Sequence, residues 1–178
     1  MSACVGALLL GLSACSEDEA RPAEPTSSAT TTSASPPPSV PSQATEFSPE
    51  GAAAFVTHYV AVIDHASKTG DVDELGRLSD PECGGCNDYI AFYERVYAEG
   101  GWLRNRNWTN GETDLWFSSK PGAEVRARTS LRVTRGEVKT GADATASTAP
   151  ASSEVVTLGL RFESGSWIVS QLVPGDVE

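Results

Sequence analysis

The chain has 178 residues, of which 39% are hydrophobic and 7% aromatic, and its formal net charge at pH 7 is −11. Such an acidic chain argues against nucleic acid as a partner and against electrostatic attraction to anionic lipid. Beyond the N-terminal region, roughly 130 residues remain, which fits one domain around one hydrophobic core.

The first residues have the pattern of a bacterial lipoprotein signal. An apolar run over residues 5–11 is followed directly by Leu12-Ser13-Ala14-Cys15. The run is shorter than the roughly 20 residues that span a bilayer, so it predicts a signal peptide over residues 1–14 that is removed. Residues 1–3 contain no Lys or Arg, and we expect a basic segment upstream of them. Cys15 would then carry the lipid and hold the chain on the extracytoplasmic face of the cell membrane.

Residues 15–46 are predicted to form a disordered stalk that begins with the lipidated Cys15. The segment is rich in Ser, Thr, Ala, Pro and Glu, and Val40 is its only large aliphatic residue. Such a segment buries too little apolar surface to offset its conformational entropy. We interpret it as a spacer between membrane and domain, with glycosylation of its Ser and Thr side chains as an alternative.

Helical signals begin the predicted domain, which covers residues 47–178. Ser48 suits the N-cap, Pro49 the first helical position and Glu50 the first turn, while Gly70 predicts the end of this helix. A short second helix is expected over residues 71–78. A third, rich in aromatic residues, is expected from residue 86 or 87 to about residue 99.

Strand patterns fill the second part of the domain. Strands are expected over residues 102–109, 113–118, 124–134, 155–163 and 167–173. The clearest is 124–134, where aliphatic and charged residues alternate. The intervening residues 136–153 are rich in Gly, Ala, Ser and Thr and are predicted to form a long mobile hairpin loop between two strands.

Helices followed by strands indicate an α+β fold, with three N-terminal helices packed on a curved antiparallel sheet of four to six strands. The long, short and aromatic-rich helices resemble the nuclear-transport-factor-like cone fold of ketosteroid isomerases and SnoaL-type cyclases. The segments 47–56, 69–71, 78–86 and 96–101 also resemble an actinobacterial lipoprotein family of unknown function. This resemblance implies the cone fold and attachment to the cell membrane, and it implies no activity.

The cysteines support an oxidising location. Cys4 lies in the predicted signal peptide and Cys15 takes the lipid, which leaves Cys83 and Cys86 in a Cys-Gly-Gly-Cys turn. In an oxidising compartment this pair favours a structural disulfide. A dithiol redox site is the alternative, because a thiol at a helix N-terminus has a lowered pKa. No metal site is expected, since neither histidine has ligand spacing to the cysteines.

Six residues are candidates for lining a pocket: His58, Tyr59, His65, Tyr89, Tyr93 and Trp102. The aromatic members could form an apolar site with a few hydroxyl groups, or they could simply pack in the core. The two histidines are seven residues apart at the edge of the first helix's apolar stripe. They are either general acid–base groups facing a cavity or partly buried structural residues. The helical wheel places Asp64 opposite the stripe, facing water, so it is not expected to be catalytic.

Arg126, Arg128, Arg132 and Arg161 are expected on the side of the sheet that faces away from the helices. They could form a docking face for an acidic partner. The alternative is a solvated face with ion pairs to Glu124 and Glu163.

Together these features predict a membrane-anchored, non-catalytic extracytoplasmic domain that binds a small apolar ligand or a partner in the cell envelope. No cofactor, metal or nucleic acid is expected, and the sequence does not predict an oligomeric state. Two alternatives stay open. One is a SnoaL-type isomerase or hydrolase with a cavity histidine and tyrosine, and the other is a Cys-x-x-Cys redox protein.

Overall fold

The computed structural model describes residues 35–120 and 122–175, so the predicted signal peptide, Cys15 and the first part of the predicted stalk lie outside the described residues. The predicted α+β class is confirmed, with helices first and antiparallel strands after them. The helices are α1 (Pro49–Thr69), α2 (Asp73–Arg77) and α3 (Gly84–Ala98). The strands are β1 (Trp102–Arg104), β2 (Trp108–Trp116), β3 (Val125–Val133), β4 (Gly136–Lys139), β5 (Ser147–Ala149), β6 (Ser152–Glu163) and β7 (Ser166–Pro174).

Local sequence signals set the bounds of α1. The Ser48 hydroxyl oxygen accepts a hydrogen bond from the backbone N–H of Gly51 at 2.9 Å, and Pro49 lies in the first turn. The helix ends at Gly70, whose φ of 76° is in the left-handed region. A side chain at Gly70 would also overlap the ring of Tyr97. Both the backbone and the packing therefore require glycine there.

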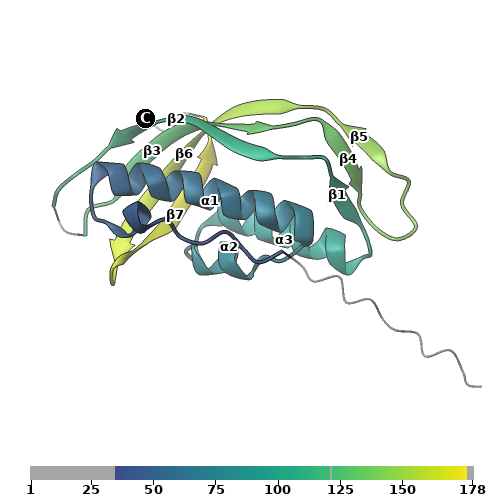
Figure 1. Ribbon diagram of the computed structural model, residues 1–178, viewed down its shortest axis with the longest axis horizontal. Helices are drawn as coiled ribbons and strands as arrows, with labels where there is room; N and C mark the ends of the chain where they lie inside the picture. Colours follow the sequence, from purple (N-terminus) through teal and green to yellow (C-terminus); the bar gives the residue numbers. More distant parts are fainter. Residues whose placement is uncertain (1–34, 121, 176–178) are drawn as a thin grey trace, which may run out of the picture. The chain divides into compact units, whose positions relative to one another are not determined.

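A four-stranded antiparallel sheet in the order β2-β3-β6-β7 carries the main core. Strand β3 confirms the predicted alternation, with Val125, Ala127 and Leu131 among its buried residues. The helices lie against one face of this sheet (Figure 1), and α1 adds Phe55 and Ile63 to the same core. Each large apolar side chain buried here contributes about 1.5–3 kcal/mol to stability, so this layer dominates the folding energy.

A second, three-stranded antiparallel sheet has the order β1-β4-β5. The predicted hairpin connection over residues 136–153 does join two paired strands, β3 and β6. It is wrong as an unstructured loop, because β4 and β5 pair there and β4 also pairs with β1. Both strands are short, and Val138 is their only large aliphatic residue, so their sequences lack a clear strand pattern. With them, the described residues contain seven strands in two sheets, more than the four to six expected in one.

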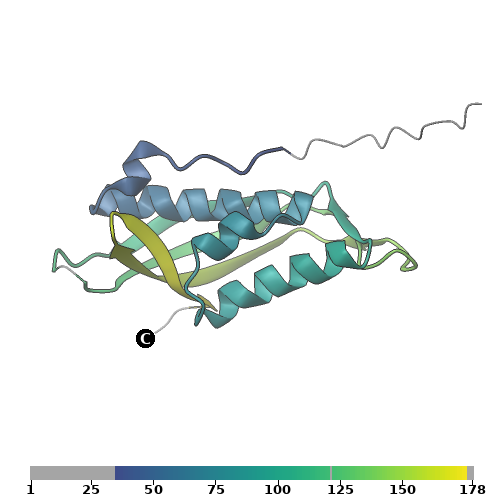
Figure 2. The same ribbon diagram turned by 90° about the horizontal axis from the view of Figure 1, so that it is seen from below.

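The chain passes from the small sheet to the large one through residues 105–107. One strand is predicted over residues 102–109, but β1 ends at Arg104 and β2 begins at Trp108. Asn105 has a φ of 58°, a left-handed conformation that turns the chain and interrupts the alternation. Figure 2 shows the small sheet at the end of the domain where α3 finishes.

The last residues of the predicted stalk pack on the domain. Ser42–Thr45 form a short 3-10 helix, and Ala44 within it is buried. The indole N–H of Trp167 donates a hydrogen bond to the carbonyl of Glu46 at 3.0 Å, and the Phe47 ring packs 5.7 Å from that of Trp167. The folded unit therefore includes these residues.

Candidate functional site

A cavity of about 380 Å³ lies between α3 and the three-stranded sheet. One wall of the cavity comes from α3, and the opposite wall comes from β1, β4 and β5. The start of β2 and the link before it, residues 105–107, lie between these walls. The lining residues are Asp88, Tyr89, Phe92, Tyr93, Leu103, Arg106, Trp108, Val138 and Ala149. The lining is thus mostly aromatic and aliphatic, with one acidic and one basic side chain.

The helical wall follows from the spacing along α3. Tyr89, Phe92 and Tyr93 are three and four residues apart, which places them on one face of a helix. The Tyr89 ring stacks on that of Tyr93 at 6.3 Å and meets the Trp108 ring edge-on at 5.5 Å. The Phe92 ring packs against that of Tyr93 at 5.5 Å. These mutual contacts hold the aromatic wall in place before any ligand arrives.

The two tyrosine hydroxyl groups of this wall remain protonated at neutral pH. Burial, followed by the neighbouring Tyr89, raises the pKa of Tyr93 far above its ordinary value, while the charge of Arg106 acts in the opposite direction. Burial also raises the pKa of Tyr89, and Glu154 adds to that shift. The Tyr93 side chain is only 1% exposed, and within the described part of the chain its hydroxyl group has no hydrogen-bond partner. Among the described residues the donor of this hydroxyl group is therefore unused.

The charged side chains of the cavity differ in their surroundings. Arg106 is half-buried on the link between β1 and β2, and its Nη1 donates to the carbonyl of Pro150 at 3.4 Å. Asp88 is exposed in the first turns of α3. An exposed carboxylate is well screened by water and salt, so Arg106 is the stronger local charge on this site.

Of the six predicted pocket residues, the structure places Tyr89 and Tyr93 on the cavity wall. Tyr59 is fully buried, and its hydroxyl oxygen lies 2.8 Å from that of Ser79. Trp102 lies outside the cavity and stacks under the guanidinium group of Arg104 at 4.0 Å. Trp108, which sequence reasoning did not single out, takes the place expected of Trp102.

The two histidines do not line the cavity. His58 is buried, and burial is the main cause of its lowered pKa. The charge of Glu74 raises this pKa and the charge of Arg77 lowers it. Because both of these neighbours belong to α2, the His58 side chain lies on the α2 side of α1. His65 is also buried, with its Nε2 3.7 Å from the carboxylate of Asp71. Both histidines thus belong to the packing around α1 and α2.

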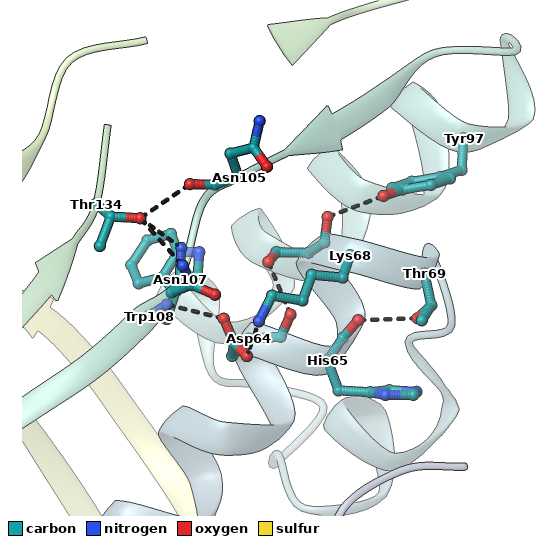
Figure 3. Close-up of polar contacts among 10 residues, drawn as sticks. Asp64, His65, Lys68, Thr69, Tyr97, Asn105, Asn107, Trp108 and Thr134 are labelled. Carbon is teal, nitrogen blue, oxygen red and sulfur yellow. Dashed lines mark hydrogen bonds and ion pairs between the residues drawn. The ribbon is translucent and has the colours of Figure 1, made fainter. Parts of the chain in front are cut away.

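Asp64 is only partly exposed to water, with 22% of its side chain accessible, so the helical-wheel prediction holds only in part. One carboxylate oxygen accepts a hydrogen bond from the backbone N–H of Trp108 at 2.8 Å, and the other pairs with Lys68 at 2.6 Å (Figure 3). The rest of the side chain is covered because β2 begins beside this face of α1. Asp64 therefore positions the start of β2, and with it Trp108.

The predicted arginine face forms ion pairs. Arg161 pairs with Asp80 and with Glu163, the latter at 3.4 Å. Arg128 lies 3.6 Å from the carboxylate of Asp114 on β2. Arg126 and Arg132 are exposed. These contacts favour a solvated, ion-paired face over an open acidic-partner site.

The sulfur atoms of Cys83 and Cys86 lie at disulfide-bonding distance, with their Cα atoms 5.3 Å apart. Cys83 caps α3, because its sulfur accepts a hydrogen bond from the backbone N–H of Cys86 at 3.3 Å. A side chain at Gly85 would overlap the carbonyl of Leu172, so this turn rests on β7. Both cysteines are buried, as suits a structural pair.

Two further kinds of feature are absent from residues 35–120 and 122–175. No group of three or more His, Cys, Asp or Glu side chains there could hold a metal ion. No helix there is long and apolar enough to cross a membrane.

Solved structures that are similar to this chain include the following three. The intermembrane space region of the chloroplast protein ARC6 is 8% identical with a TM-score of 0.55, and the match covers 73% of this chain and 98% of that one. A candidate scytalone dehydratase from Novosphingobium aromaticivorans is 13% identical with a TM-score of 0.45, covering 71% and 85%. A candidate aromatic ring hydroxylase from the same species is 14% identical with a TM-score of 0.42, covering 70% and 84%. At such identities the likeness to the ARC6 region concerns the fold alone.

Comparison with curated proteins found no match. A family model does match, over residues 19–173, and so spans nearly all of the described domain. The chain belongs to the family of unknown function DUF6318.

Proposed function

We propose that this domain binds a small, largely apolar ligand in the cavity between α3 and the three-stranded sheet. The observation that carries the proposal is the cavity itself, with its aromatic wall and an unpartnered tyrosine hydroxyl group. Its volume of about 380 Å³ falls at the lower end of the range for ligand sites, about 300–1,000 Å³. A compact ring system fits this volume better than a long lipid chain.

The proposal includes a lipid anchor on Cys15. The signal pattern at Leu12-Ser13-Ala14-Cys15 supports it. The buried Cys83–Cys86 pair at disulfide-bonding distance fits the same address, since disulfides persist mainly outside the cytoplasm. The domain would therefore meet its ligand outside the cell membrane.

The placement of the candidate catalytic groups favours binding over the two alternatives. His58 and His65 lie away from the cavity, which argues against an isomerase that uses a cavity histidine. A redox site needs an accessible thiol, whereas the side chains of Cys83 and Cys86 are buried.

The ligand proposal is tested with the full chain carrying Cys15→Ser, titrated with 1-naphthalenemethanol in a calorimeter. We expect saturable binding that Ala149→Phe weakens at least tenfold, because the new ring fills the cavity. Ala151→Phe is the matched control, since Ala151 is exposed and lies two residues further on, outside the cavity lining. The absence of binding, or equal losses in both variants, would contradict the proposal.

The anchor is tested separately in the native cells. Wild-type protein is expected in the membrane fraction, and Cys15→Ser is expected to leave it, because the lipid is the proposed attachment. Retention of Cys15→Ser on membranes would contradict the anchor without affecting the ligand site.

A further inference from the structure

The side chain of Arg106 emerges from a backbone segment that is fixed on both sides. The Thr134 hydroxyl group accepts a hydrogen bond from the N–H of Asn107 at 2.9 Å and donates one to the carbonyl of Asn105 at 3.0 Å (Figure 3). Asp64 holds the next N–H, that of Trp108. The link is thus tied to both β3 and α1, so Arg106 starts from a defined position.

The packing around Arg106 also leaves room for its side chain. A Cβ atom at Gly136, the first residue of β4, would overlap the carbonyl of Arg104 and the Arg106 side chain. Glycine at this position lets β4 approach the link closely. The Arg106 side chain therefore lies between β4 and the cavity that it helps to line.

The guanidinium group of Arg106 has unused hydrogen-bonding capacity. Arginine has five N–H donors, and among residues 35–120 and 122–175 the Arg106 side chain donates one long hydrogen bond, to the carbonyl of Pro150 at 3.4 Å. Within residues 35–120 and 122–175 Arg106 has no ion pair, in contrast to Arg77 with Glu74 and Arg161 with Asp80. The planar guanidinium group can donate two parallel hydrogen bonds to one carboxylate. At this apolar cavity, that carboxylate can come from a bound organic acid.

Tyr93 offers a second donor to the same cavity from the opposite wall. Its buried hydroxyl group stays protonated, and the charge of Arg106 is close enough to act on it. A neutral hydroxyl group can donate to a carboxylate that Arg106 also binds. Asp88, on the α3 wall, would oppose such a ligand, but its exposed carboxylate is screened.

Building on the proposed function, we infer that the ligand is a small organic acid, with an apolar ring system in the cavity and a carboxylate bound by Arg106. Tyr93 donates a second hydrogen bond to the same carboxylate. The aromatic wall supplies affinity for the ring, and the guanidinium group selects acids over neutral molecules of equal size.

The test compares 1-naphthoate with 1-naphthalenemethanol, which share one ring system and differ in charge. Both are titrated into the full chain carrying Cys15→Ser. We expect naphthoate to bind at least tenfold more tightly, and Arg106→Gln to bring the ratio of the two affinities close to one, whatever it does to the affinity for the alcohol. Saturable alcohol binding also shows that the variant is folded. Tyr93→Phe is expected to reduce the preference by a smaller factor.

Arg104→Gln is the matched control. Arg104 lies two residues away, but its guanidinium group stacks on Trp102 outside the cavity, so the preference for naphthoate should persist. Asp88→Asn should slightly increase the preference for naphthoate over the alcohol, because it removes a negative charge from the cavity lining. Equal binding of the two probes to the wild-type chain would overturn the acid assignment and leave the proposed function standing. Failure of both probes to bind would overturn both.

Discussion

The four-stranded and three-stranded sheets both face helices, but only the first has its inner side filled. On the large sheet, Val125, Leu160 and Val169 are completely buried. On the small sheet the strands are three or four residues long, and Val138 and Ala149 on its inner side are only half-buried. A strand that short presents one or two side chains to the interior. The hollow beside α3 is therefore a consequence of strand length.

The largest expected effect is a loss of unfolding free energy. It should differ between one leucine replaced in the four-stranded sheet and one replaced in the three-stranded sheet. Leu160→Ala should destabilise the domain by about 2–5 kcal/mol, because Leu160 is fully buried in the filled layer. Leu103→Ala, on the cavity wall, should cost about 2 kcal/mol, at the lower end of that range, because its side chain borders the cavity on one side. Urea unfolding of both variants measures the difference. Equal losses would mean that the cavity wall is packed as tightly as the main core.

A smaller effect concerns the junction between the layers, where Asp64 has two partners. Asp64→Ala removes the acceptor for the Trp108 N–H and should cost about 1–3 kcal/mol, because that donor is left unsatisfied. Lys68→Ala removes only the exposed ion pair within α1 and should cost about 0.3–0.5 kcal/mol. Urea unfolding again distinguishes them. If Lys68→Ala costs as much as Asp64→Ala, the bond to Trp108 does not hold the junction.

The smallest expected effect is on the pH dependence of the unfolding free energy, through His58 between α1 and α2. Burial lowers the pKa of His58 in the folded state, so the unfolded chain binds a proton there more readily. Stability is then lost as the pH falls below the unfolded pKa of about 6.5, towards the lower folded pKa. His58→Gln should therefore reduce the loss of stability between about pH 7.5 and 5.5, as followed by urea unfolding. An unchanged loss would show that other groups cause it.

Local signals in the sequence were enough to predict much of the fold. Ser48, Pro49 and Gly70 mark the ends of α1 through capping contacts within a few residues, and β3 repeats one alternating pattern over its length. The α+β class follows from the order of such elements.

The features that sequence reasoning missed depend on contacts between distant segments. Strands β4 and β5 are defined by pairing with β1 and not by an apolar pattern of their own. Trp102 and Trp108 would share one face of an uninterrupted strand. The left-handed turn at Asn105 separates them, and only Trp108 lines the cavity. No pattern around Arg106 in the sequence indicates a binding site. The residues that share the cavity with it come from distant segments, including α3, β4 and β5.

The bond between the Trp167 indole and the Glu46 carbonyl joins residues 121 positions apart. It cannot form until β7 has been synthesised and has added to the edge of the sheet. Closing so long a loop is entropically costly, so such contacts form late in folding. The N-terminal segment also packs on α1 through Glu46 and Gly51, so the bond to Trp167 is the part of its attachment that waits for the last strand.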